Sequence, residues 1–470
     1  MEALAAGLRE FFSFKAYVML PILIFFIGLG ARMRLRMAAF DALKIAAGFA
    51  GIFVAFNFFV TRIGPAVQAI ARVRGLDFPV MDVGWPPLAA ITWAWAFAPL
   101  CILAIGLLNA LFVALKWTRI LYIDIWNYWH FAFIGALFQA TGAGLVLSFA
   151  AVLLLAALNF KLTEWSVPYV QRETGIEGVG ISPLSVAGLL PWAIAMDSFI
   201  DLLPGIRRIS CNPSASATRG AGLISEPMVI GFGLGVFLGI VAGYPLKAVL
   251  EIAVEIAAVM FILPRCGGAI GEAMGDVSTA LKTVLERRVG GRGFAIAMDT
   301  GVILGNPSVI ATGLILMPIS LGLAFILPGN RLIPLGDLPN LISIFSLLVL
   351  VMRGNVFRAI IAGIPVVAAF MLIASGLAPL FTRLAAGTGM DFGNGSAAMT
   401  AFTDGGNPIR WWFLQLKAVD GLALAAILPV GFLLWLSWRG HKKASEELKA
   451  SDRSRSQPVT TAPTSSAPRR

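Results

Sequence analysis

Apolar stretches long enough to cross a lipid bilayer recur along most of the chain, with short polar or basic segments between them. A helix needs about 20 mainly apolar residues to cross the hydrocarbon core. The pattern therefore predicts a membrane protein with about eleven transmembrane helices. The predicted spans are residues 16–31, 45–61, 88–113, 125–141, 143–160, 226–243, 247–264, 301–327, 340–352, 359–377 and 412–437.

Two shorter apolar segments, near residues 183–203 and 392–409, are interrupted by glycine and proline. Non-helical backbone at membrane depth is tolerated only where protein or a water-filled cavity surrounds it. We therefore expect each segment to form a re-entrant hairpin. The predicted fold class is an all-α polytopic membrane protein.

Composition supports this class and excludes several others. Hydrophobic residues make up 58% and charged residues 13% of the 470 positions, and the mean hydropathy is +0.85. Ordinary soluble domains are about 25% charged, so a soluble enzyme, a disordered chain and a fibrous repeat are excluded. Three scattered cysteines and two histidines are too few for a histidine-rich metal centre or a haem bundle. We expect neither a metal nor a cofactor.

The net charge of +11 comes from lysine and arginine that gather beside the predicted spans. Cytoplasmic loops of membrane proteins are enriched in these two residues. With eleven spans and a periplasmic N-terminus, every basic segment and the C-terminus fall in the cytoplasm. The charge therefore indicates orientation in the bilayer and not a nucleic-acid partner. The basic segments are Arg32–Arg36, Lys116 with Arg119, Arg207–Arg219, Lys282–Arg292, Arg353–Arg358 and Arg439–Lys443.

The two halves of the chain carry similar motifs in the same order. MDVG (81–84) corresponds to MDTG (298–301), and DIWN (124–127) corresponds to DLPN (337–340). The matched aspartates are 217 residues apart in the first pair (82 and 299) and 213 in the second (124 and 337). The near-constant separation indicates an internal repeat.

Five spans in the first half force the second half to insert upside down, which predicts an inverted-topology repeat like those of many transporters. The first repeat covers residues 1–225, with five spans and the hairpin near 183–203. The second covers 226–437, with six spans, the terminal one included, and the hairpin near 392–409. Residues 438–470 are polar and then rich in Ser, Thr and Pro, which predicts a disordered cytoplasmic tail.

Ionisable residues at membrane depth are costly and are functional candidates by default. Asp82 and Asp299 hold matching positions before broken apolar segments, where a carboxylate can bind a substrate hydroxyl or cap a helix. His130 lies within an apolar span and can serve substrate binding, proton transfer or a bond to a helix carbonyl. Asn127 precedes it by three residues, so the two can share a helix face. The other candidate substrate-binding residues are Trp85, Trp129, Gln139, Ser185, Asn306, Asp404 and Asn407.

Several motifs together resemble one known family. They are DVGWP (82–86), ITWA (91–94), DIWNYWH (124–130), AGYPLKAVLEIAVEIAAVM (242–260), PGN (328–330), GDL (336–338), RGNVFR (353–358) and DGGNPI (404–409). They resemble the galactitol-type IIC permeases of the bacterial phosphoenolpyruvate-dependent phosphotransferase system, in the ascorbate–galactitol superfamily. The resemblance covers about residues 15–437, so it extends over all but the ends of the chain.

The resemblance implies a homodimer in the inner membrane, with a scaffold domain and a mobile core domain that carries the substrate like an elevator. It implies import of galactitol or a related sugar or polyol. A separate IIB protein, charged in turn by IIA, would phosphorylate the substrate from a phosphocysteine. This chain would carry no phosphoryl group itself. His130 and Asp299 are the candidate catalytic residues, because phosphoryl transfer needs an aligned and deprotonated hydroxyl.

Two departures from the family pattern leave the substrate open. The sequence Ser182–Ser185 stands where a histidine is expected in the first hairpin, and Gly305–Pro307 stands where Gly-His is expected. One alternative function is an ion-coupled secondary transporter of a polyol or sugar acid, without phosphorylation. Another is a membrane-embedded enzyme or scaffold without transport. A phosphorylated product that appears inside vesicles only when IIB is supplied would distinguish the phosphotransferase permease from these two alternatives.

Overall fold

The computed structural model describes residues 16–74, 78–212, 227–289, 294–304, 306–386 and 398–456. Most of this part of the chain is helical, as the apolar pattern predicts, and it also contains six short β-strands that the sequence did not predict. Residues 1–15, 75–77, 213–226, 290–293, 305, 387–397 and 457–470 lie outside the described residues. They include the first part of the predicted second hairpin (392–397), the end of the predicted tail, and Arg219 and Arg292 of the predicted basic segments.

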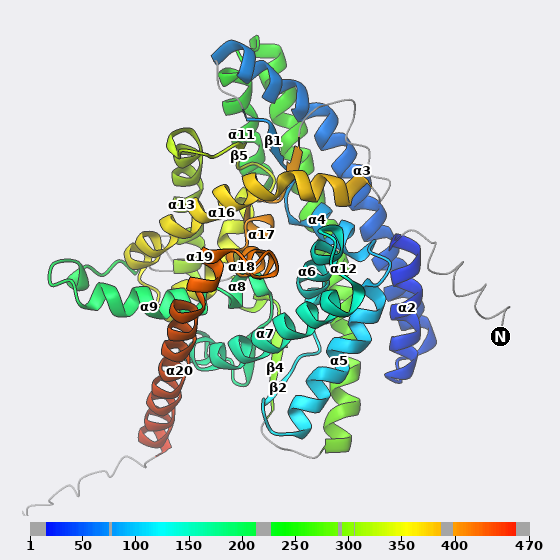
Figure 1. Ribbon diagram of the computed structural model, residues 1–470, viewed down its shortest axis with the longest axis vertical. Helices are drawn as coiled ribbons and strands as arrows, with labels where there is room; N and C mark the ends of the chain where they lie inside the picture. Colours follow the sequence, from blue (N-terminus) through cyan, green and yellow to red (C-terminus); the bar gives the residue numbers. More distant parts are fainter. Residues whose placement is uncertain are drawn as a thin grey trace, which may run out of the picture.

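Four helices form a unit along one side of the molecule (Figure 1). They are α2 (Ala16–Gly30), α3 (Leu35–Arg74), α11 (Pro227–Val241) and α12 (Leu246–Val289). α2 packs on α3, α11 packs on α12, and the long helices α3 and α12 pack on each other. The unit therefore takes one helix pair from each half of the chain.

The rest of the first half runs through short strands and broken helices to the first predicted hairpin. Its elements are β1 (Val80–Asp82), α4 (Trp85–Trp93), α5 (Ala98–Ala114), β2 (Ile120–Leu121), η1 (Trp126–Tyr128), α6 (Trp129–Ala140), α7 (Leu145–Thr174), β3 (Val179–Ile181), α8 (Leu184–Ala187), α9 (Leu190–Asp201) and η2 (Ile206–Arg208).

The second half runs through a similar succession and continues into two further helices. Its elements are β4 (Ala295–Met298), η3 (Thr300–Val302), α13 (Pro307–Ile326), β5 (Leu332–Ile333), η4 (Leu338–Asn340), α14 (Leu341–Ile344), α15 (Ser346–Val351), α16 (Val356–Ala386), β6 (Ala398–Thr400), α17 (Phe402–Gly405), α18 (Pro408–Lys417), α19 (Gly421–Ala425) and α20 (Ile427–Ser456).

The six strands form two parallel three-stranded sheets, in the orders β5-β1-β6 and β2-β4-β3. In each sheet the central strand comes from one half of the chain and both outer strands come from the other. In chain order, β1, β2 and β3 of the first half correspond to β4, β5 and β6 of the second. Exchanging each strand with its counterpart converts the order β5-β1-β6 into β2-β4-β3. The strands are two to four residues long, which is too short for an alternating pattern to show in the sequence.

Five described helices are long and apolar enough to cross a membrane, or six if α4 and α5 together form one span. These two helices meet at a bend of 91°, within what the sequence predicts as a single span at 88–113. The predicted span at 340–352 is likewise divided among η4, α14 and α15. The start of α4 and the segment of η4 and α14 line the cavity described below.

The last helix differs from the sequence-based expectation. α20 continues as far as Ser456, so residues 438–456, which the sequence placed in a disordered tail, form the second part of a helix. Its apolar first half is followed by a run rich in lysine and glutamate, both good helix formers. Polarity alone therefore predicted the end of the helix too early.

Candidate functional site

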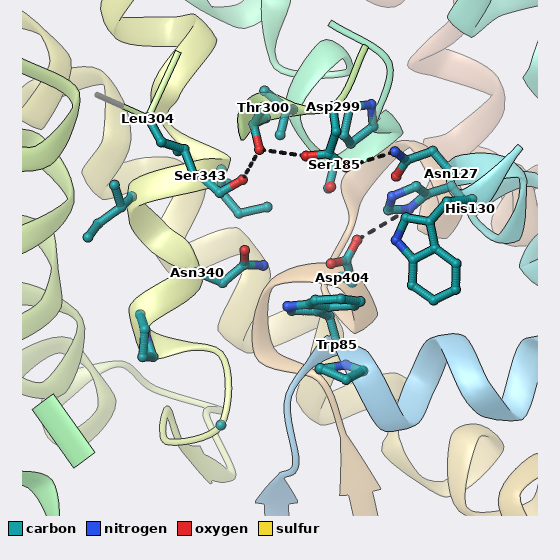
Figure 2. Close-up of a pocket in the computed structure, with 18 of the residues that line it drawn as sticks. Trp85, Asn127, His130, Ser185, Asp299, Thr300, Leu304, Asn340, Ser343 and Asp404 are labelled. Atoms are coloured by element: carbon teal, nitrogen blue, oxygen red, sulfur yellow. Dashed lines mark hydrogen bonds and ion pairs between the residues drawn. The ribbon is translucent and has the colours of Figure 1, made fainter. Parts of the chain in front are cut away.

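A cavity of about 440 Å³ lies where elements from both halves of the chain converge (Figure 2). Three indole rings, from Trp85, Trp126 and Trp129, contribute to its walls. No lysine or arginine is among the described residues that line it. The polar lining residues are Asn127, His130, Ser185, Asp299, Thr300, Asn340, Ser343 and Asp404.

Matching positions of the two halves meet in this cavity. Asn127 and Asn340 both line it, as do His130 and Ser343, and each pair is 213 residues apart. The same separation relates Asp124 to Asp337 in the motifs from which the repeat was inferred. Figure 2 shows Asn340 and Ser343 across the cavity from Asn127 and His130.

Asp299 follows β4 and is held at the cavity wall by side chains. Asn127 donates from Nδ2 to Asp299 Oδ2 at 2.9 Å and to Asp124 Oδ2 at 2.7 Å. Ser182 Oγ donates to the same oxygen of Asp124 at 2.5 Å. Thr300 Oγ1 is 2.9 Å from Asp299 Oδ1 and 2.7 Å from Ser343 Oγ. The carboxylates of Asp124 and Asp299 therefore share the Asn127 amide, and each also contacts a side-chain hydroxyl.

Asp82, the counterpart of Asp299, has different surroundings. Its side chain is fully buried and accepts four backbone N–H groups, from Gly84 at 3.2 Å, Leu335 at 2.8 Å, Asp337 at 3.1 Å and Phe402 at 2.8 Å. These donors belong to three separate loops. Since its acceptor capacity is used by the backbone, Asp82 holds the loops together and does not line the cavity.

Asp337, the counterpart of Asp124, is bound in the same way. It accepts the backbone N–H of Trp85 at 2.6 Å and both the N–H and the hydroxyl of Thr403, at 3.1 and 2.7 Å. Gly84 precedes this contact with a φ of 80°, and a Cβ there would come within 3.0 Å of the Gly336 carbonyl oxygen. The close approach of these two loops fixes Trp85 at the cavity wall.

His130 is the second residue of α6 and stacks on Trp129, with ring centroids 4.0 Å apart. Its Nδ1 lies 3.4 Å from Asp404 Oδ1, without the geometry of a hydrogen bond. Asp404 is on α17 and accepts Nη2 of Arg410 at 3.1 Å. Figure 2 shows His130 and Asp404 facing one another on one side of the cavity, with Asp299, Thr300 and Ser343 on another.

Seven of the eleven candidate residues from the sequence line this cavity. They are Trp85, Asn127, Trp129, His130, Ser185, Asp299 and Asp404. The sequence did not identify Asp124, Thr300, Asn340, Ser343 or Arg410. The repeat itself could have found Asn340, because it matches Asn127. Arg410 could have been found as an arginine in a largely apolar segment.

The other four candidates do not line the cavity. Asp82 binds backbone, as described above. Gln139 Oε1 accepts Trp95 Nε1 at 2.6 Å in an exposed position. Asn306 caps α13 through Ser308 N and Val309 N, and Asn407 caps α18 through Ile409 N and Arg410 N. Asn-Pro at a helix start explains both caps, because Asn accepts the free N–H groups and Pro fits the first turn.

Comparison with known proteins identifies the family. The family model for the sugar-specific permease component of the PTS system, EIIC-GAT, matches residues 10–395. The PTS system galactitol-specific EIIC components of Escherichia coli (strain K12) and of Escherichia coli O157:H7 are each 32% identical over 438 residues. That alignment covers 92% of this chain and 96% of each relative. Another protein of strain K12, provisionally named a permease IIC component, is 30% identical over 429 residues, 91% of this chain and 98% of its own length.

The family match spans most of the chain, and the relatives align over nearly their full lengths. The motif resemblance found in the sequence is therefore confirmed, and the cavity lies within the matched region apart from Asp404. The chain belongs to the family of sugar-specific permease components of the phosphotransferase system.

Proposed function

We propose that this protein is the IIC permease subunit of a phosphotransferase system that imports galactitol or a related polyol. A separate IIB protein would phosphorylate the substrate as it reaches the cytoplasmic side. The observation that carries this proposal is the cavity, which is lined by three indole rings together with carboxylate, amide and hydroxyl groups. The names of the galactitol-specific relatives support the substrate class.

The cavity has the chemistry that a polyol requires. Its volume of about 440 Å³ falls within the range of about 300–1,000 Å³ typical of small-molecule sites. The rings of Trp85, Trp126 and Trp129 would contact the C–H groups of the substrate. Asp299 and Asp404 would accept hydrogen bonds from its hydroxyls, and the Asn127 and Asn340 amides can donate as well as accept.

His130 and Asp299 remain the proposed catalytic residues. Transfer of a phosphoryl group to a hydroxyl requires that the oxygen be held in line and lose its proton. Asp299 lies at the cavity wall with an anionic neighbour, Asp124, and no cation among its described hydrogen-bond partners. Such a carboxylate is suited to accept the hydroxyl proton, while His130 would align the substrate from the other side.

The architecture suits an elevator mechanism in a homodimer. The unit of α2, α3, α11 and α12 would be the scaffold domain. The two sheets, the broken helices and the hairpins would be the mobile core around the cavity. The exchanged strand orders of the two sheets support two inverted repeats, at residues 1–225 and 226–437. The pairing of α11 with α12 and of α2 with α3 follows the same repeat.

The basic segments support a cytoplasmic location for the C-terminus and therefore a periplasmic N-terminus. Arg207, Arg353, Arg358 and Lys443 come from three of the segments that the sequence assigns to the cytoplasm. All four line a second cavity, of about 570 Å³, between α9, α16 and α20. Segments far apart in the chain therefore reach the same side of the molecule, as the positive-inside rule requires.

Uptake into membrane vesicles tests the proposal directly. Vesicles that contain the protein would receive radiolabelled galactitol, with and without phosphorylated cognate IIB, and the internal product would be analysed for phosphate. We expect phosphorylated product only when IIB is present. Free polyol that accumulates with a proton or sodium gradient, and without IIB, would contradict the proposal and indicate a secondary transporter.

A further inference from the structure

Arg410 is one of the largest fully buried side chains in the described part of the chain, with 2% of its surface exposed. It lies in the first turn of α18, directly after the predicted second hairpin (near 392–409). A guanidinium is a strong base that keeps its proton in proteins. Burial of such a charge is costly unless a counter-ion accompanies it, so the partners of Arg410 are informative.

Asp404 supplies that counter-ion. Nη2 of Arg410 donates to the backbone oxygen of Asp404 at 2.5 Å and to its Oδ1 at 3.1 Å. Nε and Nη1 have no hydrogen-bond partner in the part of the chain that the structure describes. Instead, the guanidinium lies 5.6 Å from the ring centroid of Trp129 and 5.1 Å from that of Phe133. Aromatic faces attract a cation but carry no countercharge, so charge balance depends on Asp404.

Asp404 connects this buried cation to the cavity. Asp404 lines the cavity wall, whereas Arg410 is not among the lining residues. The same Oδ1 that Arg410 binds is 3.4 Å from His130 Nδ1 of α6. Ser185 of the first predicted hairpin lines the same cavity. α6 and α17 therefore meet at this one carboxylate, with Arg410 behind it.

We propose that Arg410 is a positioning residue of the substrate site, which holds Asp404 as a fixed, ionised acceptor for a substrate hydroxyl. The guanidinium does not touch the substrate and acts through the Asp404 carboxylate. Protonation of Asp404 would leave Arg410 as a buried charge without a counter-ion. Asp404 therefore accepts hydrogen bonds without taking up a proton, and the hydroxyl proton goes to Asp299. This inference rests on the proposed function, because it requires a substrate that bears hydroxyl groups.

The test is calorimetric binding of galactitol, sorbitol and mannitol, and of monodeoxy analogues of galactitol, to the purified full-length protein. The variants are Arg410→Met, Asp404→Asn and the double variant, with Arg410→Lys as a charged form. Arg358→Met is the matched control, because Arg358 is also an arginine paired with carboxylates, but it is only partly buried and contacts Asp197 and Asp201. Thermal unfolding of each variant reports folding separately.

We expect Arg410→Met to weaken galactitol binding about 10- to 100-fold, the usual effect of losing a hydrogen bond to a charged group. The double variant should bind no more weakly than Asp404→Asn alone, because the two residues act as one unit. One deoxy analogue should bind wild type and Arg410→Met almost equally, because it lacks the hydroxyl that Asp404 accepts. Arg410→Lys should bind better than Arg410→Met, and Arg358→Met should bind like wild type.

Three results would overturn the inference. The first is wild-type affinity in Arg410→Met. The second is a loss in Arg410→Met that is the same for every deoxy analogue and adds to that of Asp404→Asn, which would indicate a general structural role. The third is a wild-type protein that binds none of the polyols, which would remove the proposed substrate class together with the hydroxyl-acceptor role. In the first two cases the wild type still binds polyol, so the proposed function stands.

Discussion

Asp82 and Asp299 show how one residue type at matched positions can have two different roles. Asp82 is the last residue of β1, and Asp299 directly follows β4. Asp82 receives four backbone N–H groups and is fully buried. Asp299 receives an amide and a hydroxyl from side chains and lines the cavity. The hydrogen-bond donors around a carboxylate, and not its place in the motif, therefore determine whether it can serve a ligand.

This difference predicts opposite effects for the same substitution. Asp299→Asn should leave the protein folded but slow phosphorylation of the substrate at least about 100-fold, because the amide cannot accept the proton. Asp82→Asn should lower the free energy of unfolding by about 2 kcal/mol or more, because an amide N–H₂ would face backbone donors. Thermal unfolding and IIB-dependent phosphorylation, measured on both variants, check this. An unstable Asp299→Asn with normal turnover per folded molecule would contradict it.

The sequence identified the residue types at the site better than it identified their contacts. Asn127, His130 and Asp299 were found because polar groups in apolar spans stand out, and all three line the cavity. Asn306 and Asn407 stand out equally and yet cap helices. The sequence alone does not show which donors tertiary folding brings to each oxygen, so it could not separate these two groups.

At the scale of the element, three glycines on α11 set how closely it packs on α12. A Cβ on Gly235 would lie 2.3 Å from Ala253 Cα, one on Gly239 3.0 Å from Val249 Cα, and one on Gly231 3.0 Å from Ala257 Cα. The three glycines are four residues apart, so they share one helix face. Small residues at this spacing let helices approach closely in a membrane, where packing drives association.

We predict that Gly235→Ala lowers the free energy of unfolding by about 1–3 kcal/mol, the usual cost of overpacking. Gly233→Ala is the matched control, because nothing lies within 4 Å of a Cβ at that position. Thermal unfolding in detergent would compare the two, since both carry the same change of helix propensity. Equal unfolding temperatures for the two variants would contradict the packing role of Gly235.

The long helices could be predicted from the sequence, but the breaks within predicted spans could not. α7 and α16 begin within a few residues of the starts of their predicted spans, because a long apolar stretch in a membrane has few alternatives to forming a helix. The 91° bend between α4 and α5 lies in an apolar run with a proline at the start of each helix. Hydropathy does not change across such a bend, so the pattern predicted one continuous span.

At the scale of the whole molecule, the orientation in the bilayer is open to a direct test. Cys211 is exposed, and its backbone oxygen accepts Val356 N beside the proposed cytoplasmic cavity. In a variant that keeps only this cysteine, a membrane-impermeant maleimide should label inside-out vesicles and not right-side-out vesicles. The variant Cys101→Ser/Cys211→Ser/Cys266→Ser is the control for background labelling. Labelling only in right-side-out vesicles would reverse the proposed topology.

The strand pairing has a consequence for how the protein is made. Every strand pair in the described part of the chain joins one half to the other: β2 and β3 pair with β4, and β1 pairs with β5 and β6. The sheet β2-β4-β3 cannot begin to form before the ribosome has reached residue 295. The sheet β5-β1-β6 cannot be complete before residue 400. The membrane-inserted first half must therefore wait, with β1 unpaired, until late in translation. A chain that ends between the two halves would form neither sheet. We expect membrane proteases to degrade such a chain.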